Sequence, residues 1–167
     1  MLLLSQALWA LAAIGTKAPE FSVSDGNDVQ LNSAALKGKV IVGFYEDRDQ
    51  KEKNKPLKIV LEKFYNDNLS ISSNNVFMMS VIDATPANFI TRSVWKKNFM
   101  KYSQLNRVTV YGDWDGSMKQ AYDIPDGEST FIVIDKKGVI RYICAGSFPE
   151  KYFDGIKGLI GRLCLEK

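Results

Sequence analysis

The sequence predicts an α/β fold in which a central mixed β-sheet is flanked by helices. Short runs of β-branched and aromatic residues alternate with stretches of helical periodicity, which is typical of this class. One run, residues 40–45, is nearly all apolar, as in a central strand covered on both faces. The chain has 167 residues, of which 46% are hydrophobic, so it is long enough for one domain with its own core. We expect that domain to span residues 13–167.

The first half of this domain begins with a predicted hairpin extension. Residues 21–24 and 29–31 read as its two strands, and the turn-forming sequence Asp-Gly-Asn-Asp lies between them. The strand 40–45 then precedes a helix at about 52–66, with Pro56 in its first turns. A strand at 76–82 follows, and the helix between these two strands predicts that they run parallel.

The next predicted helix covers residues 86–102. Its apolar residues recur at helical spacing and are expected to face the core: Phe89, Ile90, Val94, Trp95 and Phe99.

The second half of the domain predicts a strand at 108–111, a short helix at 116–122 and two strands at 130–134 and 139–144. A four-residue connection ending in Gly138 separates the last two strands, which indicates an antiparallel hairpin. A closing helix from about Pro149 is expected to face the sheet with residues at spacings of three and four: Phe153, Ile156, Leu159, Ile160 and Leu163.

The first twelve residues predict a signal peptide. They form an apolar run ending in Ala-Leu-Ala, the small-x-small pattern of a signal-peptidase site. The run is shorter than the ~20 residues of a spanning helix, so no stable membrane insertion is expected after its removal. Because no Lys or Arg precedes it, a helix packed on the domain or a wrongly assigned start codon stays an alternative. Export implies a periplasmic or secreted protein.

Composition excludes several classes of function. The 22 basic and 19 acidic residues are mixed along the chain, so no basic stripe predicts binding to nucleic acid or to a membrane surface. The absence of histidine removes the commonest metal ligand and the best proton carrier near neutral pH. The acidic residues around Asp113 and Asp115 lack the spacing of a calcium loop and are interpreted as turn formers. We expect no metal and no cofactor.

The order of these elements resembles the thioredoxin-like fold. Residues 15–21, 36–42, 111–122 and 129–141 are similar to its redoxin branch, the peroxiredoxins and exported cytochrome-maturation thioredoxins. This similarity runs from about residue 15 to residue 165. More narrowly, residues 51–54, the 129–141 segment and the leader resemble the YtfJ-like family of bacterial periplasmic proteins, which has no established activity. The resemblance implies thiol chemistry at a cysteine that follows the first central strand.

The thiols that this resemblance implies are absent. The two cysteines of a Cys-x-x-Cys motif would fall on Asp49 and Glu52, or on Arg48 and Lys51, and a peroxiredoxin nucleophile would fall near Lys53. A carboxylate or an amine cannot form a mixed disulfide. The active-site proline of thioredoxins is also missing, because Glu128 or Ser129 stands at its position.

The two cysteines of the chain lie elsewhere, at positions 144 and 164. Cys144 ends a predicted strand and Cys164 lies near the end of the closing helix, which rises ~1.5 Å per residue. A bridge needs Cα atoms within ~7 Å, so we expect two free, buried thiols. An exposed thiol at Cys144 stays an alternative because Ala145 and Gly146 follow it in an open loop.

These observations favour a non-catalytic binding role in the cell envelope. The predicted surface lies where the family's active site would be, in residues 46–55, 127–130 and 82–86, and its partner would be an extended peptide or another envelope protein. The residues expected to form it are Asp47, Asp49, Glu52, Lys53, Glu128, Ser129 and Thr130. A plain solvated loop with self-compensating charges stays an alternative interpretation of residues 46–55.

Two other functions stay open. The chain could be a thiol-disulfide oxidoreductase or peroxidase that uses Cys144, in which case that thiol must be reactive in the folded protein. It could also be an accessory subunit of an envelope complex, for which a large exposed apolar patch would be the structural sign.

Overall fold

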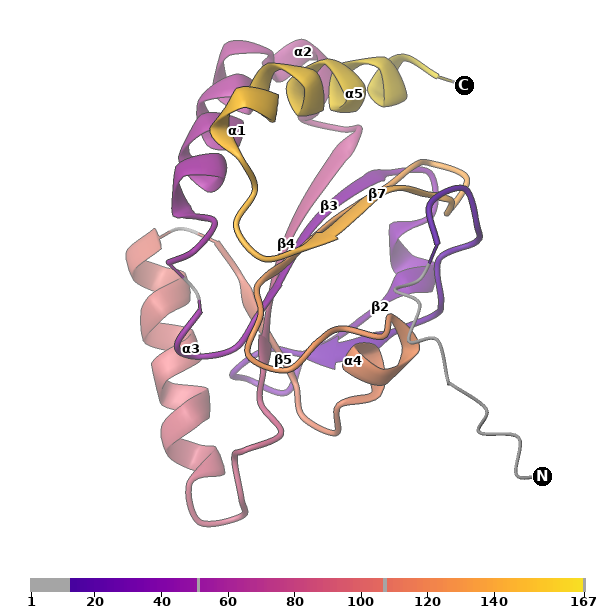
Figure 1. Cartoon of the computed structure of the whole chain (residues 1–167). Helices are drawn as coiled ribbons and strands as arrows, with labels where there is room; N and C mark the ends of the chain where they lie inside the picture. Colours follow the sequence, from indigo (N-terminus) through magenta and orange to yellow (C-terminus); the bar gives the residue numbers. More distant parts are fainter. Residues whose placement is uncertain (1–12, 51, 107, 167) are drawn as a thin grey trace, which may run out of the picture.

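A seven-stranded mixed sheet forms the centre of the molecule (Figure 1). The computed structural model describes residues 13–50, 52–106 and 108–166, so the predicted signal peptide, residues 1–12, lies outside the described residues. The strand order is β2-β1-β5-β4-β3-β6-β7. The strands are β1 (Ser22–Ser24), β2 (Gln30–Asn32), β3 (Val40–Glu46), β4 (Val76–Asp83), β5 (Val110–Asp113), β6 (Thr130–Ile134) and β7 (Ile140–Ala145).

The sheet is parallel at its centre and antiparallel toward both edges. β3 runs parallel to β4, and β4 runs parallel to β5. β6 pairs antiparallel with β3 and β7, and β1 pairs antiparallel with β5 and β2. The α/β class, the parallel pair and both predicted hairpins are therefore confirmed.

Helices cover both faces of this sheet (Figure 1). They are α1 (Lys55–Asp67), α2 (Leu69–Ser72), α3 (Arg92–Asn106), α4 (Ser117–Ala121) and α5 (Phe153–Leu165), together with 3-10 turns at Ser33–Leu36 and Glu150–Tyr152. α1, α3 and α5 lie on one face, and the short α4 lies on the other.

β3 is the centre of the core, and every one of its residues is buried. Successive side chains of a strand point to opposite faces. Val42 and Phe44 accordingly pack beneath α1 and α5, whereas Ile41 and Tyr45 pack against the cluster on the α4 side. This two-sided burial explains the nearly continuous apolar run and fixes the strand that leads into the predicted site.

α3 begins later than the sequence predicts. The Asn88 side-chain oxygen accepts the backbone N–H groups of Ile90 and Thr91, which forms a local turn in place of helix. Phe89 is 90% exposed and Ile90 69% exposed. The expectation that these two residues face the core is therefore wrong.

Within α3, the predicted burial is wrong for one residue and confirmed for another. Val94 is also exposed, contrary to the prediction. Phe99 is buried, and half-buried Trp95 packs edge-on against it with 6.1 Å between ring centroids. The other predicted elements are present with boundaries shifted by a few residues.

In the described ranges, no helix combines the length and the apolar content that crossing a bilayer would need.

Candidate functional site

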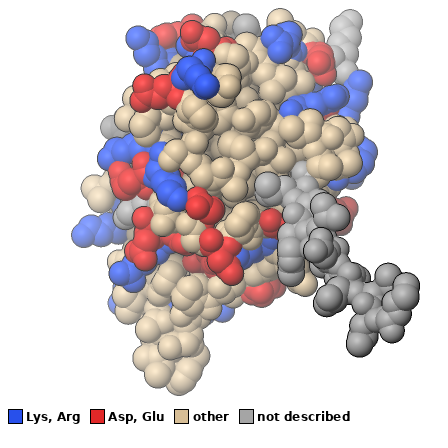
Figure 2. Space-filling view, viewed as in Figure 1, with Lys and Arg blue, Asp and Glu red and all other residues tan. Residues whose placement is uncertain are grey.

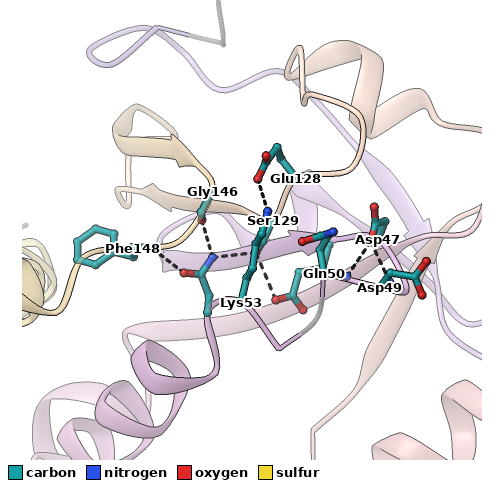
Figure 3. Close-up of polar contacts among 10 residues, drawn as sticks. Asp47, Asp49, Gln50, Lys53, Glu128, Ser129, Gly146 and Phe148 are labelled. Atoms are coloured by element: carbon teal, nitrogen blue, oxygen red, sulfur yellow. Dashed lines mark hydrogen bonds and ion pairs between the residues drawn. The ribbon is translucent and has the colours of Figure 1, made fainter.

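The loop from β3 to α1 ends against the start of β6 (Figure 3). Its first turn is held by Asp47, whose side-chain oxygen accepts the backbone N–H groups of Asp49 and Gln50 at 2.9 and 2.8 Å. This is the local capping that favours Asp in turns. Asp47 therefore shapes the loop, and the side chain of Asp49 remains exposed.

Asn54, the residue before α1, connects three segments of the chain. Its amide nitrogen donates to the Ser129 hydroxyl at 2.8 Å and to the Gly146 carbonyl at 3.0 Å. Its side-chain oxygen accepts the Phe148 N–H at 2.8 Å (Figure 3). Asn54 is 1% exposed and Ser129 is fully buried. Both amide donors and the amide acceptor are thus used within the fold.

Glu46, the last residue of β3, is a buried acid beside this amide. It is 1% exposed. One carboxyl oxygen accepts a hydrogen bond from Lys58 Nζ at 2.6 Å, and the other accepts one from the Ser129 hydroxyl at 3.4 Å. Burial raises the pKa of Glu46 above its usual range, although the contact with Lys58 opposes that shift. We call Glu46, Asn54, Lys58 and Ser129 the buried polar cluster.

Sequence reasoning missed three members of this cluster. Glu46 and Asn54 stand at the two ends of an entirely polar stretch, so the sequence pattern gives them the appearance of loop residues. Lys58 lies one turn into α1, four residues after Asn54, which places it on the same side of the helix. A charged residue directly ending an apolar strand was the only available signal.

The charged residues around the cluster form the outer layer of the site. Lys53 pairs with Glu128 at 2.6 Å, with side chains that are 33% and 40% exposed, and exposed Glu52 pairs with Lys55. Acidic and basic side chains are mixed on this side of the molecule (Figure 2). We call the exposed and half-exposed members of the predicted set the loop surface: Asp47, Asp49, Glu52, Lys53 and Glu128.

Two of the predicted surface residues lie beneath that surface. Ser129 and Thr130 are each 0% exposed. Thr130 is the first residue of β6 and pairs with Tyr45 of β3 and Ala145 of β7, so neighbouring strands enclose it. Neither side chain is available to a partner in this conformation.

The segment 82–86 belongs to a second polar cluster, at the carboxyl ends of β4 and β5. Asp83 accepts a hydrogen bond from Lys119 Nζ at 2.7 Å. Buried Asp113 accepts hydrogen bonds from the Tyr45 hydroxyl and the Lys119 backbone N–H. Asp115 accepts the Ser117 N–H in a local turn. Among the described residues, no three acidic or cysteine side chains are arranged to hold a metal ion.

Neither cysteine joins the site. Cys144 lies in β7 and packs, half-buried, against the apolar cluster beneath α1 and α5, and Cys164 is buried in α5. Both are free. Burial raises the pKa of each thiol above its ordinary value, which lowers the thiolate fraction at neutral pH. The backbone of the described residues contains no cis peptide bond, so the peptide preceding Ser129 is trans.

A family model described as Redoxin matches residues 13–160. The chain belongs to the redoxin family. A search of curated protein sequences returned no match. The positions of this redoxin at which the sequence predicts the family's thiols, Asp49 and Glu52 or near Lys53, hold no cysteine.

Solved structures show the same fold at low sequence identity. A candidate thiol:disulfide interchange protein DsbE from Chlorobium tepidum is 16% identical over 93% of this chain and 99% of its own, with a TM-score of 0.68. The reduced 2-Cys peroxiredoxin of Plasmodium vivax is 18% identical over 90% and 95%, with a TM-score of 0.58. The exposed lipoprotein thioredoxin of Streptococcus pneumoniae is 14% identical over 86% and 99%, with a TM-score of 0.60.

We predict that Asn54→Ala lowers the free energy of unfolding by about 2–3 kcal/mol. The substitution removes three hydrogen bonds and leaves the buried Phe148 N–H without its acceptor. Urea denaturation followed by circular dichroism measures the change. Asn66→Ala, on the exposed side of α1, is the matched control and should change stability by less than about 0.5 kcal/mol. Equal losses in the two variants would contradict a structural role for Asn54.

We also predict a pH-dependent effect of Glu46→Gln. The pKa of Glu46 is raised in the folded state, so the native protein binds this proton more tightly than the unfolded chain does. The stability of the wild type relative to Glu46→Gln therefore falls as pH rises from about 4.5 through the raised pKa.

Denaturation at a series of pH values measures this difference. The control is Glu62→Gln, at an exposed position of α1, whose stability relative to the wild type should stay nearly constant across the series. A wild type that gains stability over Glu46→Gln as pH rises would show that the pKa is lowered instead.

Proposed function

We propose that this redoxin acts by binding, without thiol chemistry, and that it recognises an extended peptide or another envelope protein at the loop surface. The observation that carries the proposal is Asn54, which fills the start of α1 beside β6 and uses all its hydrogen-bonding groups within the fold. The expected nucleophile positions that precede it, Asp49, Glu52 and Lys53, carry no thiol that could form a covalent intermediate with a disulfide or a peroxide.

The loop surface suits a protein partner because hydrogen bonds to buried residues fix the shape of the loop, while its charged side chains face the solvent. Asn54 and Ser129 anchor the end of the loop, and Asp47 caps its start. Lys53 and Glu128 are held in one ion pair directly above. Charged groups with defined positions favour specific recognition over tight non-specific association.

The cellular location is part of the same proposal. The apolar leader supports export, and a solved structure of the same fold is by name an exposed lipoprotein thioredoxin. We therefore propose a periplasmic or secreted protein. The narrower resemblance to the YtfJ-like periplasmic family stays a prediction from the sequence.

One observation favours a second candidate function, that of an accessory subunit in an envelope complex. Phe89, Ile90 and Val94 are 90%, 69% and 55% exposed. Figure 2 shows mostly uncharged surface over the start of α3, at the lower left of the view. Neighbouring exposed apolar side chains are typical of surfaces that associate with other proteins.

The alternative of an oxidoreductase or peroxidase based on Cys144 has a direct test. We predict that neither thiol of the folded, reduced protein reacts with iodoacetamide at the rate of a free thiol at pH 7, because both are shielded and their pKa values are raised. Mass spectrometry of the labelled protein measures the rates, and the protein in guanidinium chloride is the control. Fast labelling of Cys144, or peroxide turnover that Cys144→Ser abolishes, would support the thiol enzyme.

The binding proposal predicts loss of partners when the charges of the loop surface are reversed. The variant Asp49→Arg/Glu52→Lys/Glu128→Lys should lose partners that the wild type retains in crosslinking pull-downs from envelope extracts. The matched control reverses three charges away from this surface, with the substitutions Glu62→Lys, Asp67→Arg and Glu150→Lys.

Two outcomes would redirect the proposal. Identical partners for both charge-reversed variants would exclude the loop surface. Partners that are instead lost with Phe89→Ser/Ile90→Ser would support the accessory-subunit function.

A further inference from the structure

A cavity of about 580 Å³ lies beside α3 and borders the β3–α1 loop at Arg48. Its lining comes from the end of β3, from β4 and β5, and from one side of α3. This volume falls within the range of about 300–1,000 Å³ that is typical of small-molecule sites. Nothing in the binding function proposed above uses this cavity.

The floor of the cavity is apolar and aromatic. Ile82, Val110, Trp95 and Phe99 line it. The Trp95 ring packs edge-on against the Phe99 ring. The Trp114 ring also contacts the Phe99 ring, with 5.4 Å between the two centroids. Rings that are packed on several sides keep their positions, so the floor is formed before a ligand arrives.

The close packing of these rings depends on a glycine. An added Cβ at Gly112 would lie 2.8 Å from Phe99 and 2.8 Å from Trp114. The two rings therefore lie directly on the backbone of β5.

The charge at the cavity wall is unbalanced. Glu46 and Arg48 are the two charged residues that line it. The Glu46 carboxyl is already paired with Lys58 at 2.6 Å. Arg48 is exposed and forms no ion pair with any acidic group in the part of the chain that the structure describes. One positive charge thus remains available beside an aromatic floor.

We propose that this cavity binds a small organic anion, whose apolar body packs against Trp95 and Phe99 and whose carboxylate is bound by Arg48. A guanidinium offers two parallel N–H groups that match a carboxylate. The aromatic floor favours a ligand whose uncharged part is a ring or a branched hydrocarbon chain over one whose uncharged part is polar. Arg48 lies between Asp47 and Asp49 of the loop surface in the chain, so the two sites are tested with variants that do not overlap: Arg48→Gln for the cavity, and the charge reversals at Asp49, Glu52 and Glu128 for the loop surface.

The first test compares two probes that share a 4-phenylbutyl chain and end in a carboxylate or a hydroxyl group, 4-phenylbutyrate and 4-phenylbutan-1-ol, by isothermal titration calorimetry. The wild type should bind the carboxylate about tenfold more tightly, as expected for one charge-assisted hydrogen-bonded contact. Arg48→Gln should remove this preference and leave the affinity for the alcohol within about twofold. Equal affinities of the wild type for the two probes would overturn the assignment of an anion.

The second test shows whether the probes occupy this cavity. Asn98 is an exposed residue of α3 that lines the cavity, so Asn98→Trp fills it from outside without changing the core. Both probes should then bind at least tenfold more weakly. Lys97→Trp is the matched control, because Lys97 is the exposed neighbour on the same helix and does not line the cavity.

The outcomes of this test are distinct. Weaker binding in Asn98→Trp alone supports the proposal. Equal effects of the two tryptophan substitutions, or no saturable binding of either probe by the wild type, would overturn it. Thermal melting of each variant confirms that the fold is retained.

Discussion

The side-chain amide of Asn54 joins three segments that are distant in sequence: the start of α1, the start of β6 and the loop after β7. Each such hydrogen bond contributes only about 1 kcal/mol, yet removing the amide would leave buried partners unsatisfied, which costs more. The position therefore contributes to stability through its contacts. The positions at which the redoxin resemblance implies a reactive thiol, residues 48–53, directly precede Asn54 in the chain.

Glu46 connects the contacts of Asn54 to the central sheet, because it ends β3 and contacts Ser129. Burying a carboxyl group away from water destabilises the fold unless the group is paired and hydrogen-bonded. Lys58 and Ser129 supply those contacts to Glu46. Glu46 ends the central strand, lines the cavity beside α3, and directly precedes the loop surface in the chain. The neutralised pair explains how an acid can border an apolar cavity and still leave Arg48 as the charge that a ligand would meet.

Much of this fold follows from the sequence, and the reasons why the site does not are physical. The apolar run of β3 and the periodic apolar residues of α5 predict buried elements because their patterns are local. The burial of Asn54 is not local, since it depends on Ser129 and Gly146, about 75 and 92 residues away in the chain. The prediction for Phe89 was wrong because the Asn88 side chain accepts hydrogen bonds from backbone N–H groups, which forms a turn where the sequence pattern predicts helix.

The turn at Asp47 and the contacts of Asn54 fix the two ends of the same loop. A segment held at both ends has fewer conformations to lose when it meets a partner. Association with such a surface does not have to wait for the loop to fold, so its rate is set by diffusion and orientation. For the binding function that we propose, differences in affinity among partners would arise mainly in how long each complex lasts, so residence time is the quantity that would distinguish one partner from another.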